Sequence, residues 1–450
     1  MIANPPESTA EESHKTKGLI RLTMACNERC PFCNVPMEDY AQLTPDEDVV
    51  NSELDAFIAA GDRTLTISGG EPTLLRKRLI RLVNRAREGG IDFIEVQTNA
   101  VLIDDTYAKE LREAGVTSAF VSLLSHVPEL HDALAGLEGA FPKCVRGIRA
   151  LTEAGIRVAL NPVTARSTQH LIAEYVHFVA EHLPGVTSIS LSAVQPHGRA
   201  RTNLDLMPDY GDLRGHVLDA QTMAAQHGIE LLNPYCGLPL CVGWSDAMSK
   251  SVEAIEAQAA HTAQGLQNTG NKRHGPACID CGLRTRCGGA WHAYWDHLGG
   301  SGIQPPWRPP LPWDQPSDHR VSVHDARESP PHALDIEPAS AVVHWLWVRT
   351  LNGATFRQIL DAGVSHVAVD THLKDLKSDL ARIRRWNKAN ALLAPQRRIQ
   401  FHLRLPSGFN QVSAQEASDL IQLFRAVGIS RVHTTEDGPH SRRIKASGLS

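Results

Sequence analysis

Three cysteines near the N-terminus have the spacing of a metal-binding loop. Cys26, Cys30 and Cys33 lie in the segment MACNERCPFCNVP, directly after a strand-like run at residues 18–24. Three thiolates can hold a [4Fe–4S] cluster and leave one of its irons without a protein ligand. A zinc or structural site would need a fourth ligand close by, and no other cysteine or histidine lies in this segment. The spacing therefore predicts a cluster with one open iron, and a zinc or structural site is the alternative.

A second group of cysteines follows much later in the chain. Cys236 and Cys241 lie in PYCGLPLC, and Cys278, Cys281 and Cys287 lie in CIDCGLRTRC. Paired CxxC segments often bind zinc, but next to the first site we expect a second iron–sulfur cluster. We expect the last three cysteines to be ligands, with either Cys236 or Cys241 as the fourth. The ninth cysteine, Cys144, lies in a helix-like stretch, and we expect it to be buried and inert.

The segment that must position the first cysteines alternates strand-like and helix-like runs. Strands are predicted at residues 18–24, 63–70, 92–100, 117–125, 157–164 and 186–194, and helices at 46–61, 74–90, 104–115, 141–155 and 167–183. Repeated strand–helix units predict a parallel sheet with right-handed crossovers. Both a partial (β/α)6 barrel and a doubly wound sheet fit this α/β pattern. In either fold, active groups gather at the C-terminal ends of the strands.

The CxxxCxxC pattern, with Phe32 just before its last cysteine, resembles the signature of the radical S-adenosylmethionine (SAM) superfamily. The segment TISGGEP at residues 66–72 follows the second predicted strand, where that family carries its GGE motif. The resemblance implies a partial (β/α)6 TIM-like barrel. It also implies an enzyme that binds a [4Fe–4S] cluster and SAM, and that cleaves SAM to a 5′-deoxyadenosyl radical.

The same resemblance implies which residues contact SAM. They are Ser68, Gly69, Gly70, Glu71, Thr98, Asn99, Ser122 and Asn161. For Thr98, Asn99, Ser122 and Asn161, helix capping or turn formation is an equally good explanation, because Asn and Ser are favoured in those roles.

The region around the second cysteine group resembles the SPASM and twitch extensions of radical SAM maturases. It departs from the full SPASM pattern, because Trp291 stands where a further cysteine is usual and no cysteine follows Cys287. The resemblance implies one auxiliary [4Fe–4S] cluster in addition to the cluster of the first site.

The full sequence is predicted to divide into six segments. A disordered tail (1–17) precedes the radical SAM core (18–204), a SPASM/twitch-like cluster domain (205–300), a proline-rich linker (301–337), a small C-terminal α/β domain (338–437) and a second tail (438–450).

Composition excludes several classes of function. The net charge of −5 argues against a nucleic-acid partner, which usually requires a basic surface. No apolar run reaches the length of a membrane span, and the polar N-terminus does not have the pattern of a secretory signal. We therefore expect a cytoplasmic protein. The resemblance to radical SAM enzymes implies an electron donor such as a flavodoxin or ferredoxin.

The expected reaction is removal of a hydrogen atom from an unactivated C–H bond. SPASM-like regions accompany peptide modification, so a peptide in ribosomal-peptide maturation is the first substrate expected. Dehydrogenation or epimerisation of a small intermediate, such as an aminoglycoside or nucleoside, is the alternative. A zinc-binding scaffold without catalytic activity is an alternative of another class.

Several other segments contain residue types that allow either a functional or a structural explanation. DTHLKD at residues 370–375 resembles part of a cobalamin motif, but Asp375 replaces its glycine, and a helix start is the better explanation. Trp291, Trp295 and Trp307 could line a substrate groove or simply pack. HGRAR at residues 197–201 could bind an anionic group or form a solvated loop.

Overall fold

A computed structural model gives the fold of the chain. It describes residues 18–260, 271–278, 281–305, 320–326, 342–351, 355–405, 409, 412–434, 444, 447 and 449. The chain divides into two compact units, Met1–Leu238 and Pro239–Ser450. The predicted N-terminal tail, most of the linker, most of the predicted C-terminal tail and Trp307 lie outside the described residues.

The first unit is built on a sheet of seven parallel strands whose order follows the sequence, from β1 to β7. The strands are β1 (Gly18–Thr23), β2 (Thr64–Gly69), β3 (Phe93–Thr98), β4 (Ser118–Val121), β5 (Arg157–Leu160), β6 (Ser188–Ser190) and β7 (Glu230–Leu232). A doubly wound sheet would reverse its strand order at one point, and this sheet does not. The α/β prediction and the partial TIM-like barrel are therefore confirmed, and the doubly wound alternative is excluded.

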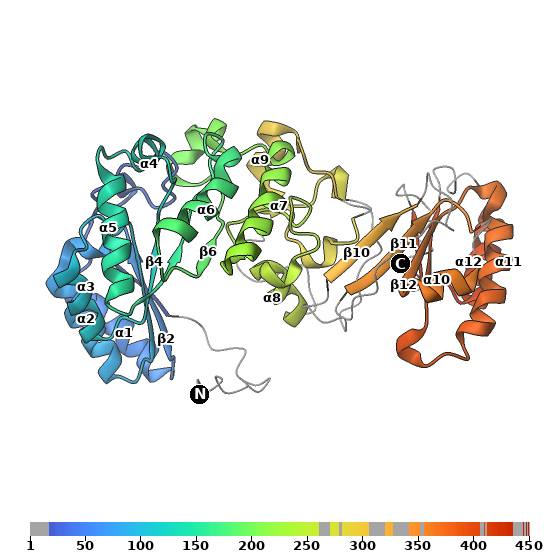
Figure 1. Ribbon diagram of the computed structural model, residues 1–450, viewed down its shortest axis with the longest axis horizontal. Helices are drawn as coiled ribbons and strands as arrows, with labels where there is room; N and C mark the ends of the chain where they lie inside the picture. Colours follow the sequence, from blue (N-terminus) through green and yellow to red (C-terminus); the bar gives the residue numbers. More distant parts are fainter. Residues whose placement is uncertain are drawn as a thin grey trace. The chain divides into compact units, whose positions relative to one another are not determined.

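Helices connect these strands. They are α1 (Glu47–Ala59), α2 (Arg76–Glu88), α3 (Asp105–Ala114), α4 (Pro128–Ala135), α5 (Ala140–Glu153), α6 (Ile172–His182) and α7 (Tyr210–His227). Helices α1, α2, α3 and α5 lie on one side of strands β2 and β4 (Figure 1). Helix α2 buries Leu79, Leu82 and Val83, and this one-sided spacing is the reason the sequence forms a helix that packs on a sheet.

Short 3-10 helices complete the connections in both units. They are η1 (Met37–Asp39), η2 (Pro72–Leu75), η3 (Gln169–Leu171), η4 (Gly198–Thr202), η5 (Leu204–Leu206), η6 (Met248–Lys250), η7 (Pro276–Cys278), η8 (Arg284–Arg286) and η9 (Pro395–Arg397).

The first unit extends beyond the predicted boundary at residue 204. Helix α7 packs against α6, and β7 pairs with β6 through the register Ser190↔Leu232. Strand β7 has only three residues, which is too short for an alternating pattern to show in the sequence. The sheet therefore has one strand more than the six predicted.

The second unit begins with the region of the later cysteines. Its elements are α8 (Val252–Ala260), β8 (Lys272–Arg273), β9 (Ala290–Trp291) and α9 (His292–Leu298), and β8 pairs with β9 in antiparallel fashion.

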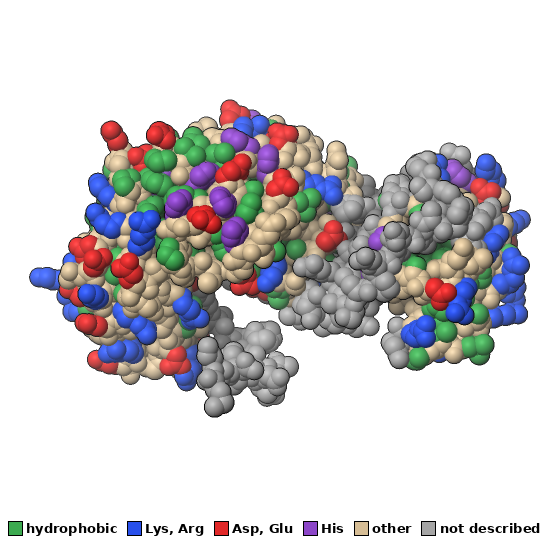
Figure 2. Space-filling view, in the orientation of Figure 1, with side chains coloured by type: hydrophobic (Ala, Val, Ile, Leu, Met, Phe, Trp, Pro, Cys, Tyr) green, Lys and Arg blue, Asp and Glu red, His purple; other side chains and the backbone are tan. Residues whose placement is uncertain are grey.

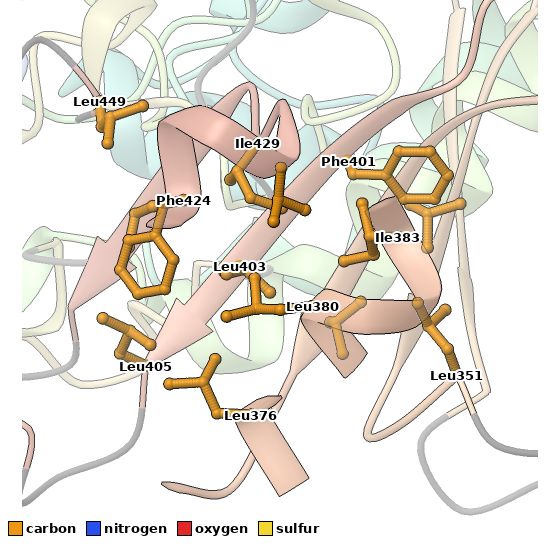
Figure 3. Packing of buried hydrophobic residues seen from close by; sticks show 14 of the residues in the cluster. Leu351, Leu376, Leu380, Ile383, Phe401, Leu403, Leu405, Phe424, Ile429 and Leu449 are labelled. Atoms are coloured by element: carbon orange, nitrogen blue, oxygen red, sulfur yellow. The ribbon is translucent and has the colours of Figure 1, made fainter. Parts of the chain in front are cut away.

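A five-stranded parallel sheet follows within the second unit, in the order β10 to β14. Its elements are β10 (Arg320–Asp325), β11 (Val342–Val348), α10 (Phe356–Asp361), β12 (Val364–Asp370), α11 (Leu373–Asn390), β13 (Gln400–Leu405), α12 (Ala414–Val427) and β14 (Arg431–Thr434). Leu380 and Ile383 of α11 and Phe424 of α12 pack with Leu403 of β13 in one apolar core (Figure 3). This sheet has its own apolar core.

None of the described helices combines the length and the apolar composition that crossing a membrane requires.

Candidate active site

The loop after β1 carries Cys26, Cys30 and Cys33, and all three line one cavity of about 340 Å³ in the first unit. The loop is held against its neighbours by backbone hydrogen bonds. The Arg29 nitrogen donates to the Ala135 carbonyl at 2.8 Å, and the Glu71 nitrogen donates to the Ala25 carbonyl at 2.8 Å. The cysteine loop is therefore anchored on both sides before any ligand binds.

Two glycines let the end of β2 approach this loop. The Gly70 nitrogen donates to the Thr23 carbonyl at 2.7 Å. A Cβ atom on Gly69 would overlap the Thr23 carbonyl oxygen, and one on Gly70 would overlap the carbonyl oxygens of Met24 and Ala25. Gly69 also has a φ of +133°, which side chains with a Cβ rarely adopt. Glycine is therefore required here for close packing of backbone on backbone.

Glu71 is fully buried and uses its carboxylate to connect three segments. Its Oε1 atom accepts hydrogen bonds from the Thr73 nitrogen at 3.0 Å, the Thr73 hydroxyl at 2.5 Å and the Thr98 hydroxyl at 2.8 Å. Its Oε2 atom accepts from the Asn99 nitrogen at 2.7 Å. Burial raises the pKa of Glu71, and these hydrogen bonds oppose that rise. Glu71 thus holds the ends of β2 and β3 in place.

The polar residues expected at the strand ends meet at this same cavity. Ser68, Gly69, Gly70, Glu71, Thr98, Asn99, Ser122 and Asn161 all line it together with the three cysteines. Asn99 also reaches the cysteine loop, because its Nδ2 atom donates to Asn27 Oδ1 at 2.8 Å. Parallel strands bring their C-terminal ends to one edge, which explains why residues so far apart in sequence come together.

Arg199 binds the outer side of the cysteine loop. Its guanidinium donates to the two carboxylate oxygens of Glu38 at 2.5 and 2.7 Å and to the Cys30 carbonyl at 3.0 Å. The Arg199 backbone nitrogen also donates to the Cys33 carbonyl at 2.9 Å. The arginine lowers the pKa of Glu38 to about 2. Of the two alternatives for HGRAR, the structure therefore shows an anion contact, but with a carboxylate of this chain.

The donor set fits a cationic cluster. Burial raises the pKa of Cys26 to about 12 and also raises the pKa of the Cys30 and Cys33 thiols. Such thiols lose their protons when a metal replaces them. Among the described residues, no three His, Cys, Asp or Glu side chains converge on a point that would hold a single metal ion. The cavity of about 340 Å³ has room for a group larger than a single metal ion.

Two buried acceptors in the same cavity have no hydrogen-bond partner in the described part of the chain. They are Glu28 Oε1 and Asn161 Oδ1, and Glu28 is only 6% exposed. Buried acceptors without a partner are costly, so this wall is suited to a ligand that carries hydrogen-bond donors.

Comparison with known proteins identifies the domain. The radical SAM superfamily matches residues 20–178, which contain the cysteine loop, the glycines and Glu71. Residues 20–178 form a radical SAM domain. Radical SAM proteins are enzymes that use a [4Fe–4S] cluster and SAM, and the three cysteines of the loop after β1 line the cavity of this domain.

The relatives of the radical SAM domain have names that indicate different substrates. A probable GTP 3′,8-cyclase of Sulfurisphaera tokodaii is 31% identical over 41% of this chain and 58% of its own length. A probable GTP 3′,8-cyclase of Sulfolobus acidocaldarius is 26% identical over 50% of this chain and 74% of its own length. A PqqA peptide cyclase of Granulibacter bethesdensis is 28% identical over 55% of this chain and 69% of its own length. The chain thus spans little more than half of the first of these relatives.

Four of the later cysteines lie together in the second unit. Cys241, Cys278, Cys281 and Cys287 line one small cavity. Burial raises the pKa of Cys241, and the neighbouring Cys287, Cys281 and Cys278 raise it further. Burial raises the pKa of Cys287 to about 11. These four thiols therefore line one cavity, and four is the number of ligands that a closed metal centre needs.

Cys236 does not line that cavity. It lines the cavity of the radical SAM domain, where its Sγ atom lies 3.1 Å from Ser192 Oγ. Of the two cysteines left open as the fourth ligand, the structure places Cys241 beside the other three. Cys144 is fully buried in α5, as its helix-like surroundings predict.

Several residues of the cavity were not recognised in the sequence as binding residues. Glu28, Gln97 and Gln195 line it, and Gln97 accepts a hydrogen bond from the Ser68 hydroxyl at 2.7 Å. The position of Glu28 between two cluster cysteines was a signal that could have been used. Gln195 lies beyond a three-residue strand, β6, where sequence offers no such signal.

The other candidates have structural roles in the described residues. Trp291 is fully buried under the Lys272 ammonium, and Trp295 donates its Nε1 hydrogen to the Arg273 carbonyl at 2.9 Å. Packing therefore explains both tryptophans. DTHLKD begins helix α11, with His372 at its N-cap. Histidine side chains gather on the face of the first unit drawn in Figure 2, and His170, His177 and His182 are exposed, as expected for a solvated face.

Proposed function

We propose that this chain is a radical SAM enzyme that removes a hydrogen atom from a peptide substrate. The observation that carries the proposal is the meeting of three partly buried thiols and eight strand-end residues at one cavity. When bound there, the cluster and SAM together supply a 5′-deoxyadenosyl radical. The chain supplies the enclosed space that protects such a species from water.

Each part of the cavity has a role in this proposal. Cys26, Cys30 and Cys33 hold the cluster. Gly69 and Gly70 let the end of β2 pack against the cysteine loop beside SAM, and Glu71 keeps that segment in place through its four hydrogen bonds. The side-chain oxygen of Asn161, Oδ1, has no partner among the described residues and accepts a hydrogen bond from the ligand.

The second cysteine group is proposed to hold an auxiliary [4Fe–4S] cluster. Cys241, Cys278, Cys281 and Cys287 supply four protein ligands, so that this cluster is closed and serves electron transfer rather than substrate binding. Electrons reach the chain from a reduced flavodoxin or ferredoxin.

The choice of a peptide rests on similarity to the PqqA peptide cyclase and on the SPASM-like cysteine spacing. Similarity to the two probable GTP 3′,8-cyclases favours a second candidate, a small nucleotide substrate.

Anaerobic reconstitution tests the chemistry. The purified chain should bind iron and sulfide, turn brown, and release 5′-deoxyadenosine and methionine from SAM under a strong reductant. Replacing Cys26, Cys30 and Cys33 with Ala should abolish this release, whereas Cys144→Ala should retain it because Cys144 lies in α5 and does not line the cavity. Release by the triple variant, or zinc without iron in the reconstituted chain, would overturn the proposal.

The substrate class is tested separately. Short peptides encoded beside the gene of this chain should increase the rate of 5′-deoxyadenosine release and gain a change in mass. If GTP increases the rate and no peptide does, the nucleotide candidate replaces the peptide.

A further inference from the structure

The loop after β7 is built to bring Cys236 into the cavity of the radical SAM domain. The side chain of buried Asn233 closes the loop, because its Nδ2 atom donates to the Leu238 carbonyl at 2.9 Å and its Oδ1 atom accepts from the Leu238 nitrogen at 2.8 Å. A turn between Pro234 and Gly237 lies within it. The position of Cys236 is thus determined by several hydrogen bonds, and it is unlike that of a cysteine on an unconstrained surface loop.

The end of β6 fixes Cys236 from the other side. The Ala193 nitrogen donates to the Cys236 carbonyl at 2.9 Å, and Ser192 Oγ lies 3.1 Å from the Cys236 sulfur. Ser192 is 2% exposed, so its hydroxyl has little access to solvent. The thiol is therefore oriented by a buried hydroxyl on the wall of the cavity.

That wall faces the cavity of the radical SAM domain. Ser192, Ala193 and Cys236 line the same cavity as Cys26, Cys30 and Cys33. The buried Glu28 Oε1 in the same cavity, which has no partner in the described part of the chain, independently indicates that a polar ligand enters.

A ligand role in the second metal centre does not account for Cys236. Cys241, Cys278, Cys281 and Cys287 already supply four thiols to that centre, and four thiolates complete a [4Fe–4S] cluster.

We propose that Cys236 is a catalytic residue that donates a hydrogen atom to the substrate radical. This rests on the proposed radical function of the same cavity. The 5′-deoxyadenosyl radical takes a hydrogen atom from substrate carbon, and the Cys236 S–H bond then breaks homolytically while a new C–H bond forms on that carbon. A thiol S–H bond is weaker than an aliphatic C–H bond, so the transfer is downhill.

The step leaves a thiyl radical on Cys236, which must be reduced and protonated before the next turnover. One electron from the low-potential donor of the flavodoxin or ferredoxin class and one proton from solvent restore the thiol. The substrate then neither gains nor loses hydrogen overall, so the reaction rearranges or inverts the substrate instead of dehydrogenating it.

Thiol labelling of the reconstituted holoenzyme is the first test. Ligand thiolates are protected by iron and Cys144 is fully buried, so anaerobic iodoacetamide should modify Cys236, and SAM should slow this modification at least several-fold. The Cys236→Ala variant should keep the iron content of the wild type. Loss of one cluster in Cys236→Ala, or no labelling of Cys236, would show that it is a ligand or is inaccessible, and would overturn the proposal.

Isotope incorporation is the second test and uses SAM alone as the probe. In D₂O the Cys236 thiol carries deuterium. Without substrate, the 5′-deoxyadenosyl radical has no substrate carbon to attack and takes this deuterium instead: the S–D bond breaks, a C–D bond forms at the 5′ carbon, and the released 5′-deoxyadenosine gains one deuterium. The deuterated fraction of the released product should fall to background in Cys236→Ala and stay at the wild-type value in Cys144→Ala. Equal fractions in wild type and Cys236→Ala, or no deuterium in either, would overturn the role of Cys236. No release of 5′-deoxyadenosine by the wild type would instead contradict the proposed function itself.

Discussion

The carboxylate of Glu71 accepts a hydrogen bond from the backbone nitrogen of Asn99 at 2.7 Å and so ties the end of β2 to the end of β3. Its other oxygen is occupied by Thr73 and Thr98. A glutamine side chain at this position cannot accept on both sides, because one of its two ends is an NH₂ group. Glu71→Gln should therefore cost about 1–3 kcal/mol of unfolding free energy and weaken SAM binding, as measured by urea unfolding and equilibrium dialysis.

Glu110→Gln provides the matched control for Glu71. Glu110 is an exposed partner of Arg76, and exposed ion pairs contribute little. Equal losses in the two variants would mean that the hydrogen bonds of Glu71 do not organise the cavity.

Gly70 packs where a methyl group has no room, since a Cβ atom there would overlap the carbonyl oxygens of Met24 and Ala25. Gly70→Ala should push the cysteine loop away from β2, destabilise the chain by roughly 1–3 kcal/mol and reduce the iron bound on reconstitution. Gly215→Ala, which meets nothing within 4 Å in helix α7, should be neutral or slightly stabilising. Full cluster loading of Gly70→Ala would contradict this account of the glycine pair.

Arg199 holds the cysteine loop through Glu38 and the Cys30 carbonyl. Arg199→Ala should release iron from the first cluster to a chelator faster than the wild type, because the loop loses its outer contact. Arg81→Ala removes a similar forked pair with Glu47 on the surface and should leave the rate unchanged. Since Arg199 lowers the pKa of Glu38 to about 2, the contact should persist throughout the pH range in which the cluster survives.

The four thiols of the second unit should behave as one site. Cys241→Ala and Cys278→Ala should each lose about four irons per chain and the matching visible absorbance, and should keep the cluster of the radical SAM domain. Cys144→Ala should lose none. A Cys241→Ala chain with its full iron content would exclude Cys241 as a ligand.

His131 is fully buried in α4, and its Nδ1 atom accepts the Leu124 N–H at 3.2 Å. Burial lowers its pKa from 6.5 to about 4. Between pH 4 and pH 6.5 the folded state therefore binds fewer protons than the unfolded state. The contribution of neutral His131 to the free energy of unfolding is fully present above pH 6.5 and is lost as the pH falls towards 4. The loss at pH 5 should be about 2 kcal/mol, measurable by urea unfolding of the cluster-free chain.

His131→Gln keeps an acceptor for Leu124 but cannot titrate, so it should flatten this part of the pH profile. His170→Gln, which alters an exposed histidine, should leave the profile as it is in the wild type. An unchanged profile in His131→Gln would assign the pH dependence to other groups.

Short-range spacing in the sequence was sufficient to recognise the radical SAM domain. The three cysteines, the glycines before Glu71 and the alternating strands and helices are local patterns, and a parallel sheet brings the ends of its strands to one edge whatever the connections contain. The predictions of fold class and cluster loop derive from these local patterns, and the family resemblance that the patterns carry implied the cavity-lining residues from 68 to 161.

Other features depended on tertiary structure because they join residues far apart in the chain. Arg199 meets Glu38 across 161 positions, and no sequence pattern links them. The sequence could not separate Cys236 from Cys241, which are five residues apart, because only folding takes one to the end of β6 and the other to the later cysteines. Spacing along the chain identifies which residues can bind a metal, whereas the path of the backbone decides which of them share a site.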